Sequence, residues 1–161
     1  MFEPSPERLR AALGRFATGV TIVTARAADG APVGLTANSF NSVSLQPPLV
    51  LWSLALSSRA LPVFQTATHF AIHVLGAQQQ ALAERFARRD VDRWAGVAWT
   101  PGAGGAPLLP QALAVFECRC RSRYPEGDHI ILVGEVLRCQ HGDATPALLY
   151  HGGRFHTGPV A

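Results

Sequence analysis

The sequence contains no lysine, only three cysteines, and no apolar run that approaches the length of a membrane span. A transmembrane helix needs about 20 consecutive apolar residues, so the chain is not expected to cross a bilayer. The first ten residues, MFEPSPERLR, hold charges and prolines in place of the apolar stretch of a signal peptide. The lack of an export signal, together with the odd number of cysteines, predicts a cytoplasmic protein.

Charged residues are also scarce, at 16% of the chain against about 25% in an average protein. All 14 basic residues are arginines spread along the chain, and the net charge is only +3. Nucleic-acid binding requires a dense basic patch with exposed aromatic side chains, and the sequence offers neither. Apolar residues make up 48% of the chain, which argues against disorder and predicts one domain over residues 1–161.

The three cysteines, Cys118, Cys120 and Cys139, are expected to be reduced thiols, since their number is odd. The Cys118-x-Cys120 spacing is wrong for a zinc site, and we expect these two thiols on the buried face of a strand. His69 and His73 also fail as a metal pair, because four residues of a strand span about 13 Å. The sequence therefore predicts no metal site.

The chain begins with a predicted helix. Ser5 is a suitable N-cap residue, and Pro6 fits the first helical position. Apolar residues then recur with helical spacing from Leu9 to Phe16. Gly19 is expected to end the helix.

Runs rich in β-branched and aromatic residues predict strands along the rest of the chain. They cover residues 20–25, 33–39, 49–56, 70–75, 113–124, 129–139, 148–150 and 154–156. Gly134, inside one of these strands, indicates a bulge or a close backbone approach. Further helices are predicted within residues 57–66 and 77–89. Because helices do not alternate regularly with strands, we expect a mainly β fold, an antiparallel barrel of about six strands with helices packed outside.

Residues 34–42, with the sequence GLTANSFNS, form the most unusual stretch of the chain. They include both asparagines of the protein, Asn38 and Asn41, beside several hydroxyl side chains. Hydroxyls, amides and free backbone N–H groups are suitable donors for a phosphate or a polar heterocycle. The alternative is a hydrogen-bonded strand end followed by a turn.

His129 follows the Gly127-Asp128 turn and begins a predicted strand. A histidine in this position can stack on a ring, orient a cofactor or transfer a proton. The alternative is a structural histidine bonded to nearby backbone, with Asp128 as a turn residue. The glycines within residues 102–107 do not form a dinucleotide-binding loop, since no helix follows them.

Several short motifs follow one another in order along the chain. They are FATGVTIVT (16–24), GLTANSF (34–40), SVSLQPP (42–48), FAIHVL (70–75), LAERF (82–86), GDH (127–129) and PALLYH (146–151). Each motif is weak alone, but the ordered set resembles the short-chain flavin reductase family over about residues 8–156. Members of that family are FMN-binding split barrels that supply reduced flavin to a separate monooxygenase, as in the reductase component of 4-hydroxyphenylacetate 3-monooxygenase.

The resemblance implies an NAD(P)H:flavin oxidoreductase that forms a homodimer and passes a hydride from NADH or NADPH to FMN or FAD. Its implied cofactor-binding residues are Thr36, Ala37, Asn38, Ser39, Ser53, Leu54, Ser57, Ser58, Arg59, Gly127 and His129. Ser58 and Arg59 would meet the flavin phosphate, and His129, the implied catalytic residue, would lie near the flavin ring and the nicotinamide. His73 stands where many relatives have asparagine.

Two other functions remain open. The first is an FMN-containing reductase that acts on another acceptor, such as a cobalt corrinoid or a ferric chelate. The second is a non-enzymatic split barrel that binds flavin or haem.

Overall fold

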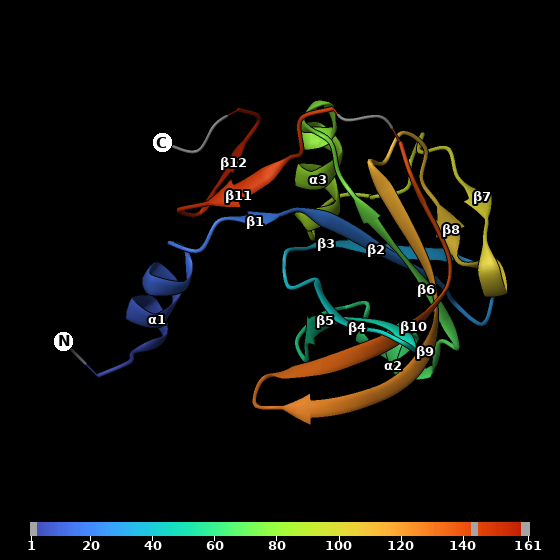
Figure 1. The fold of residues 1–161 in the computed structure, drawn as a ribbon, viewed down its shortest axis with the longest axis horizontal. Coiled ribbons are helices and arrows are strands. Elements are labelled where there is room, and N and C mark those ends of the chain that lie inside the picture. Colours follow the sequence, from blue (N-terminus) through green and yellow to red (C-terminus); the bar gives the residue numbers. More distant parts are fainter. Residues whose placement is uncertain (1–2, 143–144, 159–161) are drawn as a thin grey trace.

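A seven-stranded antiparallel sheet dominates the computed structural model, which describes residues 3–142 and 145–158 (Figure 1). In spatial order the strands are β3 (Pro32–Ala37), β2 (Thr21–Arg26), β6 (His69–Val74), β9 (Ala114–Glu126), β10 (His129–His141), β5 (Pro48–Ala55) and β4 (Asn41–Leu45). Every neighbouring pair is antiparallel. The predicted antiparallel, mainly β architecture is therefore confirmed.

The sheet curls until β3 and β5, which are not neighbours in the strand order, come into contact (Figure 1). The Ser39 hydroxyl fastens this closure, because it accepts a hydrogen bond from the Ser53 N–H at 2.9 Å and donates one to the Ser53 carbonyl at 3.1 Å. Inside the barrel, the fully buried Trp52 packs edge-to-face on Phe64 and Phe70. This aromatic cluster forms the centre of the main core.

Two helices pack against the barrel. The short α2 (Leu61–Thr66) contributes Phe64 to the main core, and α3 (Gln80–Ala87) follows a 3₁₀ turn at Ala77–Gln79. On α3, Phe86 is fully buried and lies against Gly34 of β3. A Cβ at position 34 would stand 3.0 Å from the Phe86 ring and 3.1 Å from Trp94, so only glycine allows this close packing without displacing the rings.

Two smaller sheets complete the fold. In one, β1 (Thr18–Gly19) pairs with β11 (Leu149–His151), which pairs in turn with β12 (Arg154–His156). In the other, β7 (Thr100–Pro101) pairs with β8 (Pro107–Leu108), with a 3₁₀ turn at Ala103–Gly105 between them. None of the strands predicted from sequence covers β4, β7 or β8.

The first helix, α1 (Pro6–Leu13), is shorter than predicted. Ser5 is its N-cap, as expected, and accepts a hydrogen bond from the Arg8 N–H. The helix ends at Gly14 and not at Gly19, because the Gly14 carbonyl accepts a hydrogen bond from the Gly152 N–H of the β11–β12 hairpin. The chain is thereby drawn away from the helical path, and α1 buries none of its residues.

Gly134 shows both features expected of it. The β9–β10 register shifts between Val133 and Gly134, which marks a bulge. A Cβ at position 134 would stand 2.7 Å from the Phe70 ring, so the backbone also makes a close approach. Within the described ranges, no helix is both long and apolar enough to pass through a membrane.

Candidate functional site

A cavity of about 310 Å³ opens where the ends of β3 and β5 meet the C-terminal end of α3 and the start of β10. Most of the predicted cofactor-binding residues line it. These are Thr36, Ala37, Asn38, Ser39, Ser53, Leu54, Ser58 and His129. The fold thus brings together residues from positions 36 to 129 that no local pattern connects.

The hydroxyls of Thr36 and Ser39 already have partners within the fold. Thr36 donates to the Ala83 carbonyl of α3 at 2.6 Å, and Ser39 bonds to the backbone of Ser53. By contrast, the exposed Asn38 side chain makes no hydrogen bond to any residue that the structure describes. In this segment it is the Asn38 amide that is available to a ligand.

The backbone of β3 adds further hydrogen-bonding groups. β3 lies at the end of the sheet order, and it pairs in register only with β2. Every second N–H and carbonyl of such an edge strand points away from its neighbour. These groups and Asn38 form a neutral polar wall suited to the donors and acceptors of a heterocycle.

His129 also lines the cavity. It pairs in register with Ala55 of β5, and the Leu56 N–H donates to the Asp128 carbonyl at 2.9 Å, so the β10 turn is tied to the end of β5. The imidazole Nδ1 lies 2.6 Å from Asp128 Oδ1. Because a carboxylate only accepts, Nδ1 carries the proton and Nε2 is left for another partner. This bond holds the pKa of the Asp128 carboxyl below its usual range.

A second cavity, of about 270 Å³, continues from the first. The two share Ser58, Arg89 and Arg93, while Arg59 and Trp94 line only the second. Ser58 Oγ accepts from the Ala60 N–H and still has its own proton to donate. Arg89 and Arg93 were missed by the sequence analysis, although the Arg88-Arg89 pair directly after α3 and the nearby Arg93 were a visible signal.

Two predicted residues lie outside both cavities. Ser57 is exposed on the connection after β5, and Gly127 occupies the β9–β10 turn with a φ of +59°. That left-handed conformation favours glycine, so Gly127 shapes the turn that positions His129. The structure gives Gly127 a positioning role beside the site.

His73 is fully buried and does not line either cavity. Its Nδ1 donates to the Ile22 carbonyl at 3.0 Å, and its Nε2 accepts from the Leu109 N–H at 3.1 Å. Burial lowers the pKa of His73 to about 4, so the ring is neutral at pH 7. Here histidine connects β6 to β2 and to the segment after β8.

Cys118 is buried in the main core and the half-buried Cys120 packs against the same core from β9, as predicted, whereas Cys139 is exposed. Burial raises the pKa of the Cys118 thiol to about 12 and raises that of Cys120. All three are free thiols. None of them lines either cavity.

The donor set of the joined cavities fits a phosphorylated flavin. One end offers uncharged amide and backbone groups and an imidazole, which suit a polar ring system. The other end offers guanidinium groups and the Ser58 hydroxyl, which suit a phosphate. A ligand with a neutral ring and an anionic phosphate therefore matches the site, with the ring beside the uncharged groups and the phosphate beside the guanidinium groups.

Known proteins of similar sequence are named as flavin reductases or as reductase subunits of flavin-dependent monooxygenases. The sequence model described as a flavin reductase like domain matches residues 13–159. The chain is 51% identical to the FMN reductase (NADH) SmoA of Agrobacterium fabrum over 96% of this chain and 89% of SmoA. It is 39% identical to the flavin-dependent monooxygenase reductase subunit HsaB of Rhodococcus jostii over 91% of this chain and 75% of HsaB.

Solved structures of flavin reductases have the same fold as this chain. The NADH:FAD oxidoreductase SgcE6 of Streptomyces globisporus superimposes with a TM-score of 0.91 at 38% identity, covering 99% of this chain and 98% of SgcE6. Some matched proteins are longer, and this chain spans 48% of one curated relative and 54% of one crystallised relative.

Proposed function

The chain belongs to the flavin reductase-like domain family, and from this premise we propose that it is an NAD(P)H:flavin oxidoreductase that transfers a hydride to FMN or FAD. The observation that carries the proposal is the pair of joined cavities, whose walls change from neutral hydrogen-bonding groups to guanidinium groups along their length. Residues 1–161 act as one domain in this proposal.

Bound flavin would supply the acceptor for the hydride of a reduced nicotinamide. The protein needs to align the two rings and exclude competing reactions, because the cofactors carry the chemistry. Asn38 and the edge of β3 hold the ring, and Ser58 and Arg59 hold the phosphate end. His129, fixed by Asp128, positions the nicotinamide against the flavin.

Steady-state assays separate this function from its alternatives. We expect NADH oxidation to be rapid only when free FMN or FAD is added, because the site is an open cavity rather than an enclosed one. Turnover with tightly held FMN and a cobalt or ferric acceptor would favour the second function. No pyridine-nucleotide oxidation with any acceptor would favour a non-enzymatic binding module.

We propose that reduced flavin is handed transiently to a partner monooxygenase. Support comes from HsaB, which is named as the reductase subunit of such a system. We place the reaction in the cytoplasm, where the three free cysteines would remain reduced.

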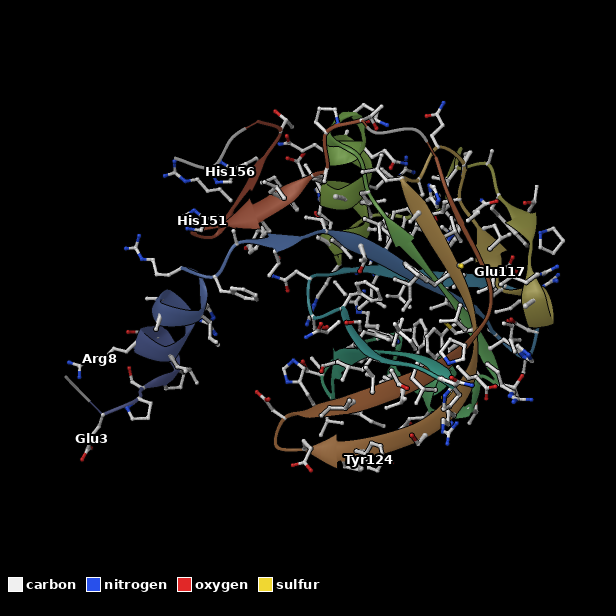
Figure 2. All side chains as sticks on the ribbon, viewed as in Figure 1. Glu3, Arg8, Glu117, Tyr124, His151 and His156 are labelled. Carbon is white, nitrogen blue, oxygen red and sulfur yellow. The ribbon has the colours of Figure 1, made fainter. Side chains whose placement is uncertain are left out.

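We also propose a homodimer, because large apolar side chains are exposed on α1, on the segment after it, and on the outer strand β4. Leu45 is 94% exposed, Phe16 76% and Leu13 64%. In Figure 2 the α1 end, with Glu3 and Arg8, stands apart from the β9 strand that bears Glu117 and Tyr124. Stable homodimers commonly bury about 2,000 Å² or more, and these surfaces would contribute to such an interface.

Light scattering should therefore return twice the 17.2 kDa chain mass at micromolar concentration. Phe16→Asp is expected to shift the equilibrium toward monomer, because it places a charge among these apolar side chains. A 17.2 kDa species for the unmodified chain would contradict the dimer.

Asn38→Ala and Ser39→Ala form a matched pair that separates binding from folding. Asn38→Ala should weaken flavin binding about fivefold, since a net hydrogen bond contributes about 1 kcal/mol, and should leave the melting temperature unchanged. Ser39→Ala should weaken binding and also lower the melting temperature, because it removes both bonds to Ser53. Flavin titration and thermal unfolding measure the two effects. Unchanged affinity in both variants would mean that this segment is structural.

A further inference from the structure

We propose that Arg85 is a positioning residue, which holds the segment after α3 from outside both cavities and thereby slows the release of bound flavin. The proposal rests on the function proposed above, because it concerns how long flavin stays in that site. It follows from the hydrogen bonds of the segment, from the charges that the segment carries, and from the place of Arg85 on α3.

Residues 88–95, the arginine loop, follow α3 and contain neither helix nor strand. Within the described ranges, the backbone of this loop makes only two hydrogen bonds to other backbone groups. The Arg88 N–H donates to the Arg85 carbonyl at 3.2 Å, and the Trp94 carbonyl accepts from the Val97 N–H at 3.0 Å. The shape of the loop therefore depends largely on side chains.

Arg85 supplies two of the bonds that fix the arginine loop. Its Nη2 atom donates to the Asp92 carbonyl at 2.9 Å and to the Ala95 carbonyl at 2.5 Å. An Nη2 atom carries two N–H groups, so each carbonyl can receive a proton of its own. Hydrogen bonds from a charged donor are stronger than those between neutral groups. One side chain thus holds both ends of the stretch that contains Arg93 and Trp94.

In the position that Arg85 maintains, the arginine loop forms part of the site. Arg93 lines both cavities, and Trp94 lines the second. Arg93 also donates to the Gly34 carbonyl of β3 at 2.8 Å, which connects the loop to the edge strand. An outward movement of the loop would withdraw both side chains and open the joined cavities to solvent.

The charges around the arginine loop favour such an outward movement when no anion is bound. Burial, together with the charges of Arg89 and Arg59, lowers the pKa of Arg93. Like charges that are brought together repel one another. Arg85 opposes this repulsion through hydrogen bonds to the loop backbone, and these bonds do not require a bound anion.

Arg85 itself lies outside the site. It is half-buried in the last turn of α3 and lines neither cavity, so its removal takes no group away from the flavin. Reduced flavin has to leave the protein if it is handed to another enzyme. Loop opening commonly sets the rate of such a release step. Loss of the Arg85 bonds should therefore speed the exit of flavin without impairing hydride transfer.

Limited proteolysis with trypsin measures the hold of Arg85 on the arginine loop in the absence of flavin. The chain contains no lysine, so trypsin cleaves only after arginine, and the loop offers Arg88, Arg89 and Arg93. Arg85→Ala should be cut in the loop about 10-fold faster than the unmodified chain, the size expected for one charge-assisted hydrogen bond. The melting temperature should change little, because alanine is the best helix former and α3 is kept.

Arg121→Ala is the matched control, because it removes the same charge from an exposed position on β9 outside both cavities. Its arginine loop should be cut at the unmodified rate. Arg85→Lys should lie between Arg85→Ala and the unmodified chain, because an ammonium group keeps the charge but lacks the planar set of donors. If Arg85→Ala does not fold, Arg85→Lys replaces it, with a smaller effect in the same direction.

Stopped-flow dissociation of FMN measures the consequence for the site. Arg85→Ala should release FMN about 10-fold faster than the unmodified protein, while the anaerobic rate of hydride transfer to bound FMN is little changed. A KM for FMN that rises while kcat does not fall should accompany this change. A purely structural role would instead lower the melting temperature and slow both processes.

The proposal is overturned if the arginine loop of Arg85→Ala is cut no faster than that of the unmodified chain, or if cleavage after arginines throughout the chain accelerates equally. Equal rates of FMN release from the two proteins would also overturn it. Failure of the unmodified protein to bind FMN would instead contradict the proposed function itself.

Discussion

His129→Ala is expected to lower the rate of NADH oxidation by about 10- to 100-fold, which corresponds to about 1.4–2.8 kcal/mol of lost transition-state stabilisation. The ring lines the cavity, and the bond to Asp128 fixes its orientation. Hydride transfer needs alignment and not proton abstraction, because the hydride carries its own electron pair. Much of the effect should therefore appear as a raised KM for NADH, while flavin affinity changes less.

Asp128→Asn provides the companion variant for this prediction. It keeps the side-chain shape and a weaker hydrogen bond to His129 Nδ1. We therefore expect a smaller fall in the rate of NADH oxidation than His129→Ala causes. A purely structural His129 would instead give a lower melting temperature with near-normal kinetics. Wild-type turnover by His129→Ala would remove the catalytic assignment.

Acidification is expected to destabilise the fold through His73. Its pKa is lowered to about 4 in the folded protein by burial, from an ordinary value of 6.5. Below pH 6.5 the unfolded chain binds a proton at His73 that the folded chain excludes. The stability that the neutral His73 ring contributes is therefore fully present above pH 6.5 and is lost progressively as the pH falls toward 4. The loss amounts to about 3 kcal/mol at most, since each unit of pKa difference is worth about 1.4 kcal/mol.

His73→Asn isolates this effect from the other titrating groups. Asparagine can still hydrogen-bond to backbone, but it does not titrate. Denaturant unfolding of both proteins at several pH values should show the wild-type free energy of unfolding falling relative to that of the variant as pH drops from 6.5 to 4. A difference between the two proteins that stays constant with pH would refute the role of His73.

The strands could be predicted from sequence because residue alternation and β-branched runs report directly on a half-buried sheet. The end of α1 could not, because it depends on the hydrogen bond from Gly152, which is remote in sequence. β4 was missed for a related reason. Its residues are mostly exposed, so burial leaves no alternating pattern there.

The candidate site was partly predictable. The concentration of asparagine and hydroxyl side chains in residues 34–42 and the Gly-Asp-His motif both pointed to residues that line the first cavity, which we propose as the flavin site. Residue type alone could not show that the hydroxyls of Thr36 and Ser39 are occupied by Ala83 and Ser53. Arg89 and Arg93 reach the site only because α3 packs on β3, which is a tertiary contact.

The central claim, that this protein passes a hydride from NADH to flavin, is tested most directly by anaerobic mixing of the protein with NADH and FAD. Loss of the visible flavin absorbance should follow enzyme concentration, consume one flavin per NADH, and slow when deuterium replaces the transferred hydrogen at nicotinamide C4. His129→Ala should show the same stoichiometry at a reduced rate. Absorbance loss no faster than in the mixture without protein would contradict the claim.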